Sequence, residues 1–303
     1  MSFSQFRLPL LAFTSALLWG SAFPVIKIVY SQWETNSFEL RLCFAGVRFT
    51  LAGLLILPFC FREIRRCRAD CIGLLVLLSL TQTCLQYIFF YSGLAVSSGV
   101  LGAILVSTGS LWWIVLAPIL LKTSRPQRRH AAVVGISMAG VVLAVYAPGM
   151  GSGSPVLGGV LFLFASLSGA ISAIIIVPLA QRMDVRLATA GALFFGGLVL
   201  CLGGMRAFPA FWQLADTKMM WTVLYLAGVS GGAFGIWNWL VQQYSVNVLA
   251  GYRFLIPLSG VTQSAVFIQG ESLGLGILLG GAMIVGSLVY LHRAENRTAT
   301  ADR

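Results

Sequence analysis

The chain has 303 residues, of which 58% are hydrophobic and only 10% are charged. A soluble globular domain carries about 25% charged residues, so this composition excludes a disordered chain, a coiled coil and almost any soluble enzyme. Ten segments of ~20 residues would take up roughly two thirds of the chain. The sequence therefore predicts an all-α membrane protein with very little chain outside the bilayer.

Apolar runs separated by polar breaks predict ten transmembrane helices. Their expected ranges are 9–30, 41–60, 71–92, 99–121, 131–148, 156–180, 187–205, 220–244, 250–270 and 274–292. The first run is too long for the apolar part of a signal peptide and lacks a small-residue cleavage site. We therefore expect it to be retained as a helix.

Lys and Arg number 20 against 9 Asp and Glu, a net charge of +11. The excess sits in short loops, which indicates the positive-inside rule rather than a nucleic-acid partner. With a cytoplasmic N-terminus, the inside segments hold Arg7, Arg62, Arg65, Arg66, Arg68, Lys122, Arg125, Arg128, Arg129, Arg182, Arg186, Arg293, Arg297 and Arg303. The outside loops hold only Arg206 and Lys218, with Arg41 at a margin. The prediction is a multi-pass protein of a bacterial inner (plasma) membrane, with both termini cytoplasmic.

Catalytic and metal motifs are absent from the sequence. The six cysteines form no CxxC pair and are expected to be reduced structural thiols, so we expect no metal site. There is no GxxxxGK[ST] phosphate loop, and both histidines, His130 and His292, fall at cytoplasmic helix ends. We therefore expect neither an enzyme nor a bound cofactor.

Short matches recur within the chain at an offset of about 150 residues. Residues 94–96 fall on 244–246, Leu105 falls on Leu255, and 17–21 lies near 166–170. An odd number of helices in each half forces the second half to be inverted in the membrane, as in many transporters. The expected division is a first repeat at 1–148, a periplasmic linker at 149–155, a second repeat at 156–292 and a cytoplasmic tail at 293–303.

Four segments carry a resemblance to a known family. They are LLWGSAFPVIKI from Leu17, RFTLAGLLILP from Arg48, YSGLAVSSG from Tyr91, and LIPLSGVTQSAVFIQGESLGLGILLGGAMIVGSLVY from Leu255. With these segments the chain resembles the EamA-type permeases of the drug/metabolite transporter superfamily. It departs from the family's pattern in two places. After the fourth helix LKTSRPQRRH stands where the family often has a Gly-Glu turn, and within the fourth helix the usual proline is absent, with Ser107 opposite Pro257.

The resemblance implies a ten-helix permease for small metabolites, made of two EamA-like repeats. Known members move amino acids, related amphipathic metabolites and some toxic compounds. The resemblance also implies that the first, third, fourth, sixth, eighth and ninth helices enclose a substrate cavity, which opens alternately to each side.

A proline and a tryptophan lie near the middle of the first helix. Pro24 has no N–H, so the carbonyl of Gly20 loses its helical partner beside Trp19 and Ser21. This arrangement suits either a substrate ledge or a packing kink. Pro257 has the same effect in the ninth helix, and we expect both prolines to act as gating kinks.

Amide side chains lie deep in two predicted helices. Gln82, Gln86 and Tyr87 belong to the third helix, and Trp237 and Asn238 belong to the eighth. Lipid offers amides no hydrogen-bond partner, so they either bond across helices or line a wet cavity. We expect them to line the cavity.

The fourth and ninth helices add further candidates for the cavity wall: Ser107, Trp112 and Gln263. Serine can also satisfy itself on its own helix backbone. Trp112 and Trp113 cannot both face the cavity, because adjacent helical positions lie ~100° apart; we slightly favour Trp112.

Three cations are candidates for the transport pathway: Lys27, Arg48 and Arg253. Each either pairs structurally or attracts a substrate carboxylate. All nine acids, in contrast, fall in loops, tails or helix ends. The lack of a midplane carboxylate predicts facilitated export, or coupling through another group, and argues against cationic drugs as the main substrate.

These observations predict a secondary transporter that exports small metabolites, with amino acids or related zwitterionic and anionic compounds as the leading class. A hydrophobic-drug efflux permease and a non-transporting membrane scaffold are the alternatives. The expected partners are a small-molecule substrate and the lipid bilayer. Small-residue spacings such as Gly228/Gly232 and Gly276/Gly280 suit close helix packing, either within the chain or in a homodimer.

Overall fold

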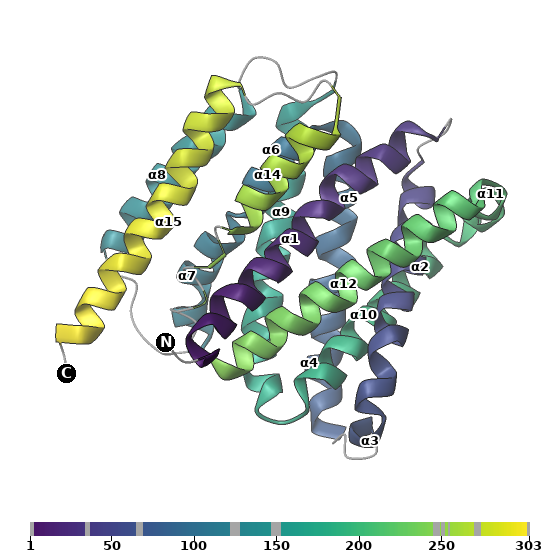
Figure 1. The fold of residues 1–303 in the computed structure, drawn as a ribbon, viewed down its shortest axis with the longest axis horizontal. Helices are drawn as coiled ribbons and strands as arrows, with labels where there is room; N and C mark the ends of the chain where they lie inside the picture. The colour runs from purple at the N-terminus through teal and green to yellow at the C-terminus, as the bar shows by residue number, and fades with distance from the viewer. Residues whose placement is uncertain are drawn as a thin grey trace.

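The computed structural model describes residues 3–33, 37–64, 69–121, 128–146, 153–244, 249, 252–253, 255–269 and 274–301. The regular elements of these residues are all helical (Figure 1). Seven helices are long and apolar enough to cross a membrane: Arg7–Ser31, Phe38–Cys60, Ala69–Val96, Gly99–Ala117, Pro155–Ala180, Val185–Gly203 and Thr217–Gln243. Three shorter apolar helices, Ala132–Val145, Leu255–Phe267 and Leu275–Ser287, accompany them. The chain is a multi-pass membrane protein.

The helices follow one another in an order close to the predicted one. They are α1 (Phe3–Ser31), α2 (Phe38–Ile56), η1 (Leu57–Cys60), α3 (Phe61–Ile64), η2 (Ala69–Cys71), α4 (Ile72–Leu78), η3 (Ser79–Leu85), α5 (Gln86–Val96), α6 (Gly99–Val106), α7 (Gly109–Leu120), α8 (Arg128–Val145), α9 (Pro155–Ala180), α10 (Val185–Gly203), η4 (Met205–Ala207), α11 (Phe208–Leu214), α12 (Thr217–Gln243), α14 (Leu255–Phe267) and α15 (Leu275–Ala301).

Three predicted segments differ in the structure. The segment 99–121 divides into α6 and α7 at a turn over Ser107 and Thr108, whose hydroxyls both donate to backbone carbonyls three residues back. The segment 250–270 forms α14 only from Leu255. Helix α15 continues as far as Ala301, so the expected tail 293–303 is helical over its described part. The sequence prediction also missed α11, a short helix inside the long connection 206–218.

The third predicted helix changes its winding at its centre. Residues 79–85 form a π-helix between α4 and α5. The hydroxyls of Ser79 and Thr81 each donate 2.8 Å hydrogen bonds to carbonyls four residues back, on Leu75 and Leu77. Such bonds compete with the regular backbone ladder, and π-helical turns are frequent at functional sites. Gln82 lies in this segment and Gln86 follows it directly.

Helices α2 and α10 pack with their backbones in contact. A Cβ atom at Gly46 would lie 2.5 Å from the amide nitrogen of Cys201, and one at Gly197 would lie 2.4 Å from that of Thr50. Only glycine permits so close an approach.

Replacing Gly197 with alanine should therefore lower the stability of the protein. The new methyl group meets backbone atoms that cannot move alone, and such overpacking costs about 1–3 kcal/mol. Thermal unfolding in detergent measures the loss. Gly228→Ala is the matched control, because a Cβ atom there meets nothing within 4 Å. An equal melting temperature for the two variants would contradict the close packing.

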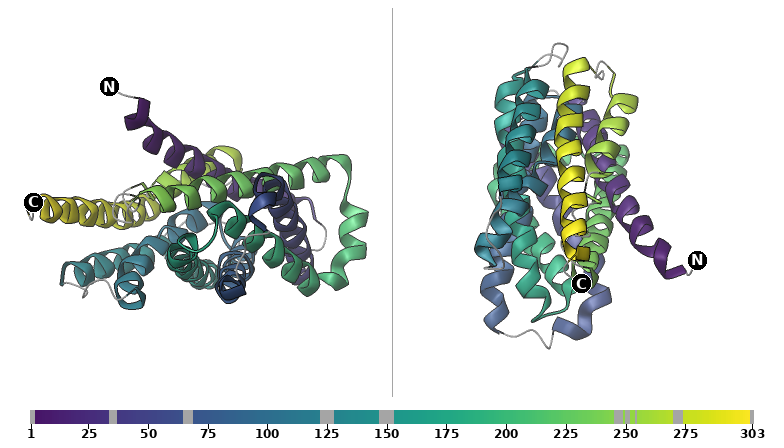
Figure 2. Two further views of the ribbon diagram at one scale, coloured as in Figure 1. Left: turned by 90° about the horizontal axis from the view of Figure 1, so that it is seen from below. Right: turned by 90° about the vertical axis from the view of Figure 1, so that its left-hand side faces the viewer.

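Helices α8 and α15 lie side by side at one edge of the bundle (Figures 1 and 2). The hydroxyls of Ser137 and Ser287 hydrogen-bond where the two helices cross. A Cβ atom at Gly140 would lie 2.7 Å from the carbonyl oxygen of Gly280. Ser137 and Ser287 are 150 positions apart, which is the offset of the short sequence matches.

The ends of the bundle differ in the elements they carry. The start of α1 and the end of α15 lie toward the same end as α3, while α11 lies at the opposite end (Figure 1). Asp184 caps α10, accepting the backbone N–H of Arg186 at 2.8 Å and pairing with its guanidinium at 2.9 Å. The hydrogen bond from the Arg186 side chain lowers the pKa of the Asp184 carboxyl.

Candidate substrate cavity

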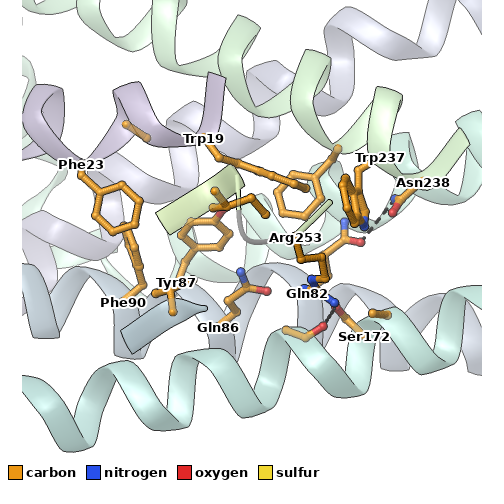
Figure 3. A pocket seen from close by; sticks show the side chains of 16 residues that line it. Trp19, Phe23, Gln82, Gln86, Tyr87, Phe90, Ser172, Trp237, Asn238 and Arg253 are labelled. Carbon is orange, nitrogen blue, oxygen red and sulfur yellow. Dashed lines mark hydrogen bonds between the residues drawn. The ribbon is translucent and has the colours of Figure 1, made fainter. Parts of the chain in front are cut away.

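A cavity of about 90 Å³ lies inside the bundle, large enough for several water molecules (Figure 3). Its wall consists of Trp19, Ala22, Phe23, Gln82, Gln86, Tyr87, Phe90, Val106, Gly169, Ser172, Ala173, Phe234, Trp237, Asn238, Arg253 and Ile256. These residues come from α1, η3 with α5, α6, α9, α12, and α14 with the turn before it. They are the six helices that the resemblance implied would enclose a cavity.

The two ends of the cavity differ in chemistry. Figure 3 shows Gln82, Ser172, Asn238 and Arg253 toward one end, and the rings of Phe23 and Phe90 toward the other. The described residues of the wall include one cation and no carboxylate. This arrangement suits a small amphipathic molecule that carries a hydrogen-bond acceptor or a negative charge.

Six of the ten residues predicted to line the cavity lie on its wall: Trp19, Gln82, Gln86, Tyr87, Trp237 and Asn238. Arg253, predicted as a pathway cation, lies there as well. Whether any of them binds a substrate stays a prediction.

The other four predicted residues have partners elsewhere. Ser21 accepts a 2.7 Å hydrogen bond from the hydroxyl of Tyr225 on α12. Ser107 donates to the carbonyl of Ile104 on its own helix. Gln263 donates to the carbonyl of Leu17 at 3.1 Å and so joins α14 to α1.

Trp112, the fourth, donates from its indole nitrogen to the hydroxyl of Ser166 at 3.1 Å, away from the cavity. The neighbouring Trp113 is buried, and the guanidinium carbon of Arg253 lies 5.2 Å from its ring centre. Neither tryptophan is on the cavity wall, but Trp113, the one we disfavoured, contacts the wall residue Arg253. Ser166 on α9 provides the hydrogen-bond acceptor that fixes the other ring.

The two prolines occupy different places in their helices. Pro24 is buried inside α1, which is one continuous helix, and whether it acts as a gating kink stays a prediction. Pro257 lies in the first turn of α14, where the missing N–H would have no helical partner in any case. The carbonyl of Arg253 is not free either, because it accepts the N–H of Ile256 at 3.2 Å.

The other two candidate cations bridge helices. Lys27 donates to the carbonyls of Leu94 and Ser97, at 3.1 and 2.8 Å, and so joins α1 to the end of the α5 segment. Arg48 has an exposed fraction of 0% and donates to the carbonyl of Leu226 and the hydroxyls of Ser230 and Tyr91. Neither residue lines the cavity.

A chain of hydrogen bonds joins three helices behind the polar end of the cavity. The hydroxyl of Thr189 on α10 donates to the carbonyl of Val185 at 2.7 Å. The amide nitrogen of Asn238 donates to the same hydroxyl at 2.8 Å, and lies 3.5 Å from the amide oxygen of Gln82. Thr189, which sequence reasoning missed, therefore contacts a residue of the cavity wall without lining it.

The resemblance implied that α9 helps to enclose the cavity, but none of its wall residues was predicted from the sequence. Gly169, Ser172 and Ala173 lie 150 positions after Trp19, Ala22 and Phe23, and all six residues line the cavity. Tyr87 and Trp237, and Val106 and Ile256, are further wall residues 150 positions apart. The offset of 150 that relates Leu105 to Leu255, applied to Trp19, would have found Gly169.

A second hollow lies between α6, α14 and α15. It has a volume of about 330 Å³ and is lined by Ile104, Pro257, Leu258, Val261, Ile277, Leu278, Gly281, Ala282 and Val285. Its lining is apolar, and Leu258 and Leu278 are exposed on the outside of the bundle. This position suits contact with lipid acyl chains.

Comparison with known proteins gives consistent relatives. Residues 7–146 match the sequence model of the EamA-like transporter family. The uncharacterized transporter YvbV of Bacillus subtilis is 26% identical over 93% of this chain and 90% of its own length. A probable amino-acid metabolite efflux pump of Salmonella typhimurium is 25% identical over 93% of both chains. The uncharacterized inner membrane transporter YedA of Escherichia coli K12 is 27% identical over 93% of this chain and 92% of its own.

A solved crystal structure shares the fold. It superposes with a TM-score of 0.64 over 95% of this chain and 97% of its own, at 18% sequence identity. The family match over residues 7–146, the relatives along nearly the whole chain and the helical fold together support an EamA-type permease of the drug/metabolite transporter superfamily.

Proposed function

We propose that this protein exports small zwitterionic or anionic metabolites, with amino acids as the leading class. The observation that carries the proposal is the cavity, whose described wall combines amides, aromatic rings and the single cation Arg253 without a carboxylate. A cationic substrate would have no counter-charge there, whereas an anion or zwitterion would. The Salmonella relative with the printed name of an amino-acid metabolite efflux pump supports the same class.

The proposed architecture is ten spans in two inverted five-helix halves, residues 1–148 and 156–292. The pairs of wall residues 150 positions apart support it, as does the hydrogen bond between Ser137 and Ser287. A two-fold axis in the membrane plane brings equivalent residues of antiparallel helices together at their crossing. The linker 149–155 lies largely outside the described residues.

The proposed orientation has both termini in the cytoplasm of a bacterial cell. Arg7, Arg62 and Arg293 lie on the elements at one end of the bundle, and Arg206 lies beside α11 at the other. The positive-inside rule assigns the end with more cations to the cytoplasm.

The proposed transport cycle uses the cavity as a single binding site between the halves. Elements of both halves contribute to its wall, so a rocking motion of one half against the other exposes the site to each side in turn. Gly20 and Gly260 permit the close crossing of α1 and α14, where a Cβ atom on Gly20 would lie 2.9 Å from the amide nitrogen of Gly260. In the proposed cycle, α1 and α14 either move together as one unit or separate at this crossing.

Counterflow in proteoliposomes tests the proposed function. Vesicles are loaded with one unlabelled compound, from a panel of amino acids and organic acids, and receive the labelled form outside. We expect accumulation for at least one carboxylate compound without an imposed ion gradient. If folded protein accumulates no compound of the panel, the proposal is contradicted. Efflux of apolar drugs is then favoured, and the apolar hollow beside α14 is the feature that supports it.

Water access distinguishes a transporter from a scaffold. A Gln86→Cys variant in a cysteine-free background should react with a water-soluble maleimide, because Gln86 lines the cavity. The control is Val76→Cys, since Val76 is exposed on the outside of an apolar helix and should face lipid. We expect at least about tenfold faster labelling at position 86. Equal, slow labelling at both positions would argue for a scaffold.

A further inference from the structure

Two nitrogen atoms on side chains of the cavity wall have no hydrogen-bond partner. They are Nε2 of Gln82 and Nη1 of Arg253, and both atoms are buried. Gln82 itself is only 2% exposed. A buried donor without a partner costs free energy, and no described group of the protein supplies one here, so both nitrogens call for an acceptor on a bound molecule. Both unpaired atoms are donors.

The hydrogen-bond chain behind the cavity determines the orientation of the Gln82 amide. The hydroxyl hydrogen of Thr189 is used by the carbonyl of Val185, so the Thr189 oxygen can only accept from Asn238. This makes the atom of Asn238 at Thr189 its nitrogen, which directs its second N–H toward Gln82. The nearer atom of Gln82 is therefore its oxygen, and its N–H groups are left for the cavity.

Arg253 lies next to the same part of α12. Its guanidinium carbon is 5.7 Å from the ring centre of Trp237, the residue before Asn238. Trp113 lies 5.2 Å from the same carbon, so two aromatic rings hold the guanidinium. Arginine is always protonated and offers only donors.

We infer that this donor-only end, Gln82 with Arg253, binds the carboxylate of the transported molecule, and that Thr189 and Asn238 are positioning residues that keep Gln82 a donor. A carboxylate accepts several hydrogen bonds and carries the negative charge that would pair with Arg253. A carboxamide matches less well, because it brings its own donors, and an ammonium group is repelled. The inference rests on the proposed function and specifies how its site selects among small metabolites.

The first test is competition against counterflow with matched pairs. Counterflow of labelled leucine is measured with unlabelled leucine or leucinamide as the competitor. Counterflow of labelled phenylalanine is measured with phenylalanine or phenylalaninamide, and further acids of the panel are paired with their amides in the same way. The acids should compete at least about tenfold better, the equivalent of 1.4 kcal/mol. Equal competition by acid and amide would overturn the inference while leaving the proposed function standing.

The second test addresses the positioning residues. Thr189→Val removes the acceptor that orients Asn238 and should weaken competition by the acids about tenfold, with little change for the amides. Thr189→Ser keeps the hydroxyl and should retain the selectivity. Thr83→Val is the matched control: Thr83 is equally buried and also faces α10, but its hydroxyl donates to the carbonyl of Ala192 and holds no wall amide.

A variant at the binding residue keeps the inference testable if Thr189→Val does not fold. Gln82→Met keeps the side-chain length without donors and should lose the same preference for acids. Unchanged selectivity in folded Thr189→Val or Gln82→Met would overturn the inference alone. Absence of counterflow for every carboxylate with wild-type protein would overturn the proposed function and the inference with it.

Discussion

Replacing Arg253 with glutamine should lower kcat/KM for carboxylate export by roughly 30- to 1,000-fold. Arg253 is the cation among the described residues of the cavity wall, and its Nη1 atom has no protein partner. Removing a charge that pairs with a buried ligand costs about 2–4 kcal/mol. The packing between Trp113 and Trp237 should survive in part, because glutamine keeps some of the side-chain stem.

Initial rates of counterflow at varied substrate concentration measure this loss. Arg253→Lys should keep the charge but not the planar fork, and we expect a value between those of wild type and the glutamine variant. Arg206→Gln is the control. Arg206 is exposed beside α11, away from the cavity, so this variant should transport at the wild-type rate. Wild-type kcat/KM in folded Arg253→Gln would show that the substrate's charge is not recognised at this end of the cavity.

Replacing Arg48 with lysine should lower the free energy of unfolding by about 2–4 kcal/mol, although the charge is kept. The Arg48 side chain is 0% exposed and reaches two helices at once. Its Nε atom donates to Leu226 and Ser230 on α12, at 3.2 and 2.9 Å, while Nη1 donates to the Tyr91 hydroxyl on α5 at 2.8 Å. A single ammonium group cannot reproduce that span, and a charge inside the membrane is costly when its partners are lost.

Chemical or thermal unfolding in detergent or bicelles measures the effect. Arg206→Lys, at an exposed site, should leave stability unchanged. Arg48→Met removes the charge together with the hydrogen bonds, so comparing it with Arg48→Lys separates the cost of a buried charge from the loss of donors. A lysine variant as stable as wild type would show that the guanidinium shape is not required.

Much of the fold was predictable because lipid imposes strict conditions on a spanning chain. Every spanning segment must satisfy its own backbone, so apolar runs such as 156–180 were placed within one residue of α9. Local hydrogen bonding was not visible in the same way. The π-helix at 79–85 and the turn at Ser107 and Thr108 depend on hydroxyls that donate to nearby carbonyls, and composition does not reveal when they do so.

The cavity wall was only partly predictable, for a related reason. A deep amide such as Gln82 or Asn238 is visible in a sequence because lipid cannot solvate it. Small wall residues such as Gly169 carry no such signal by themselves. For Ser21 and Gln263 the same polar chemistry serves to join helices, which no single segment can indicate.

The sequence by itself determined that the chain is helical, crosses the membrane many times and resembles one transporter family, since hydropathy and short motifs are properties of single segments. Only the tertiary structure decided which polar groups meet. Arg253 lies on the cavity wall and has an unpaired donor, whereas Arg48 donates its hydrogen bonds to partners on two other helices. The tertiary structure also brought Thr189 behind Gln82 through Asn238. A side chain's partners lie on helices distant in sequence, so whether it binds a ligand or the protein is decided only by packing.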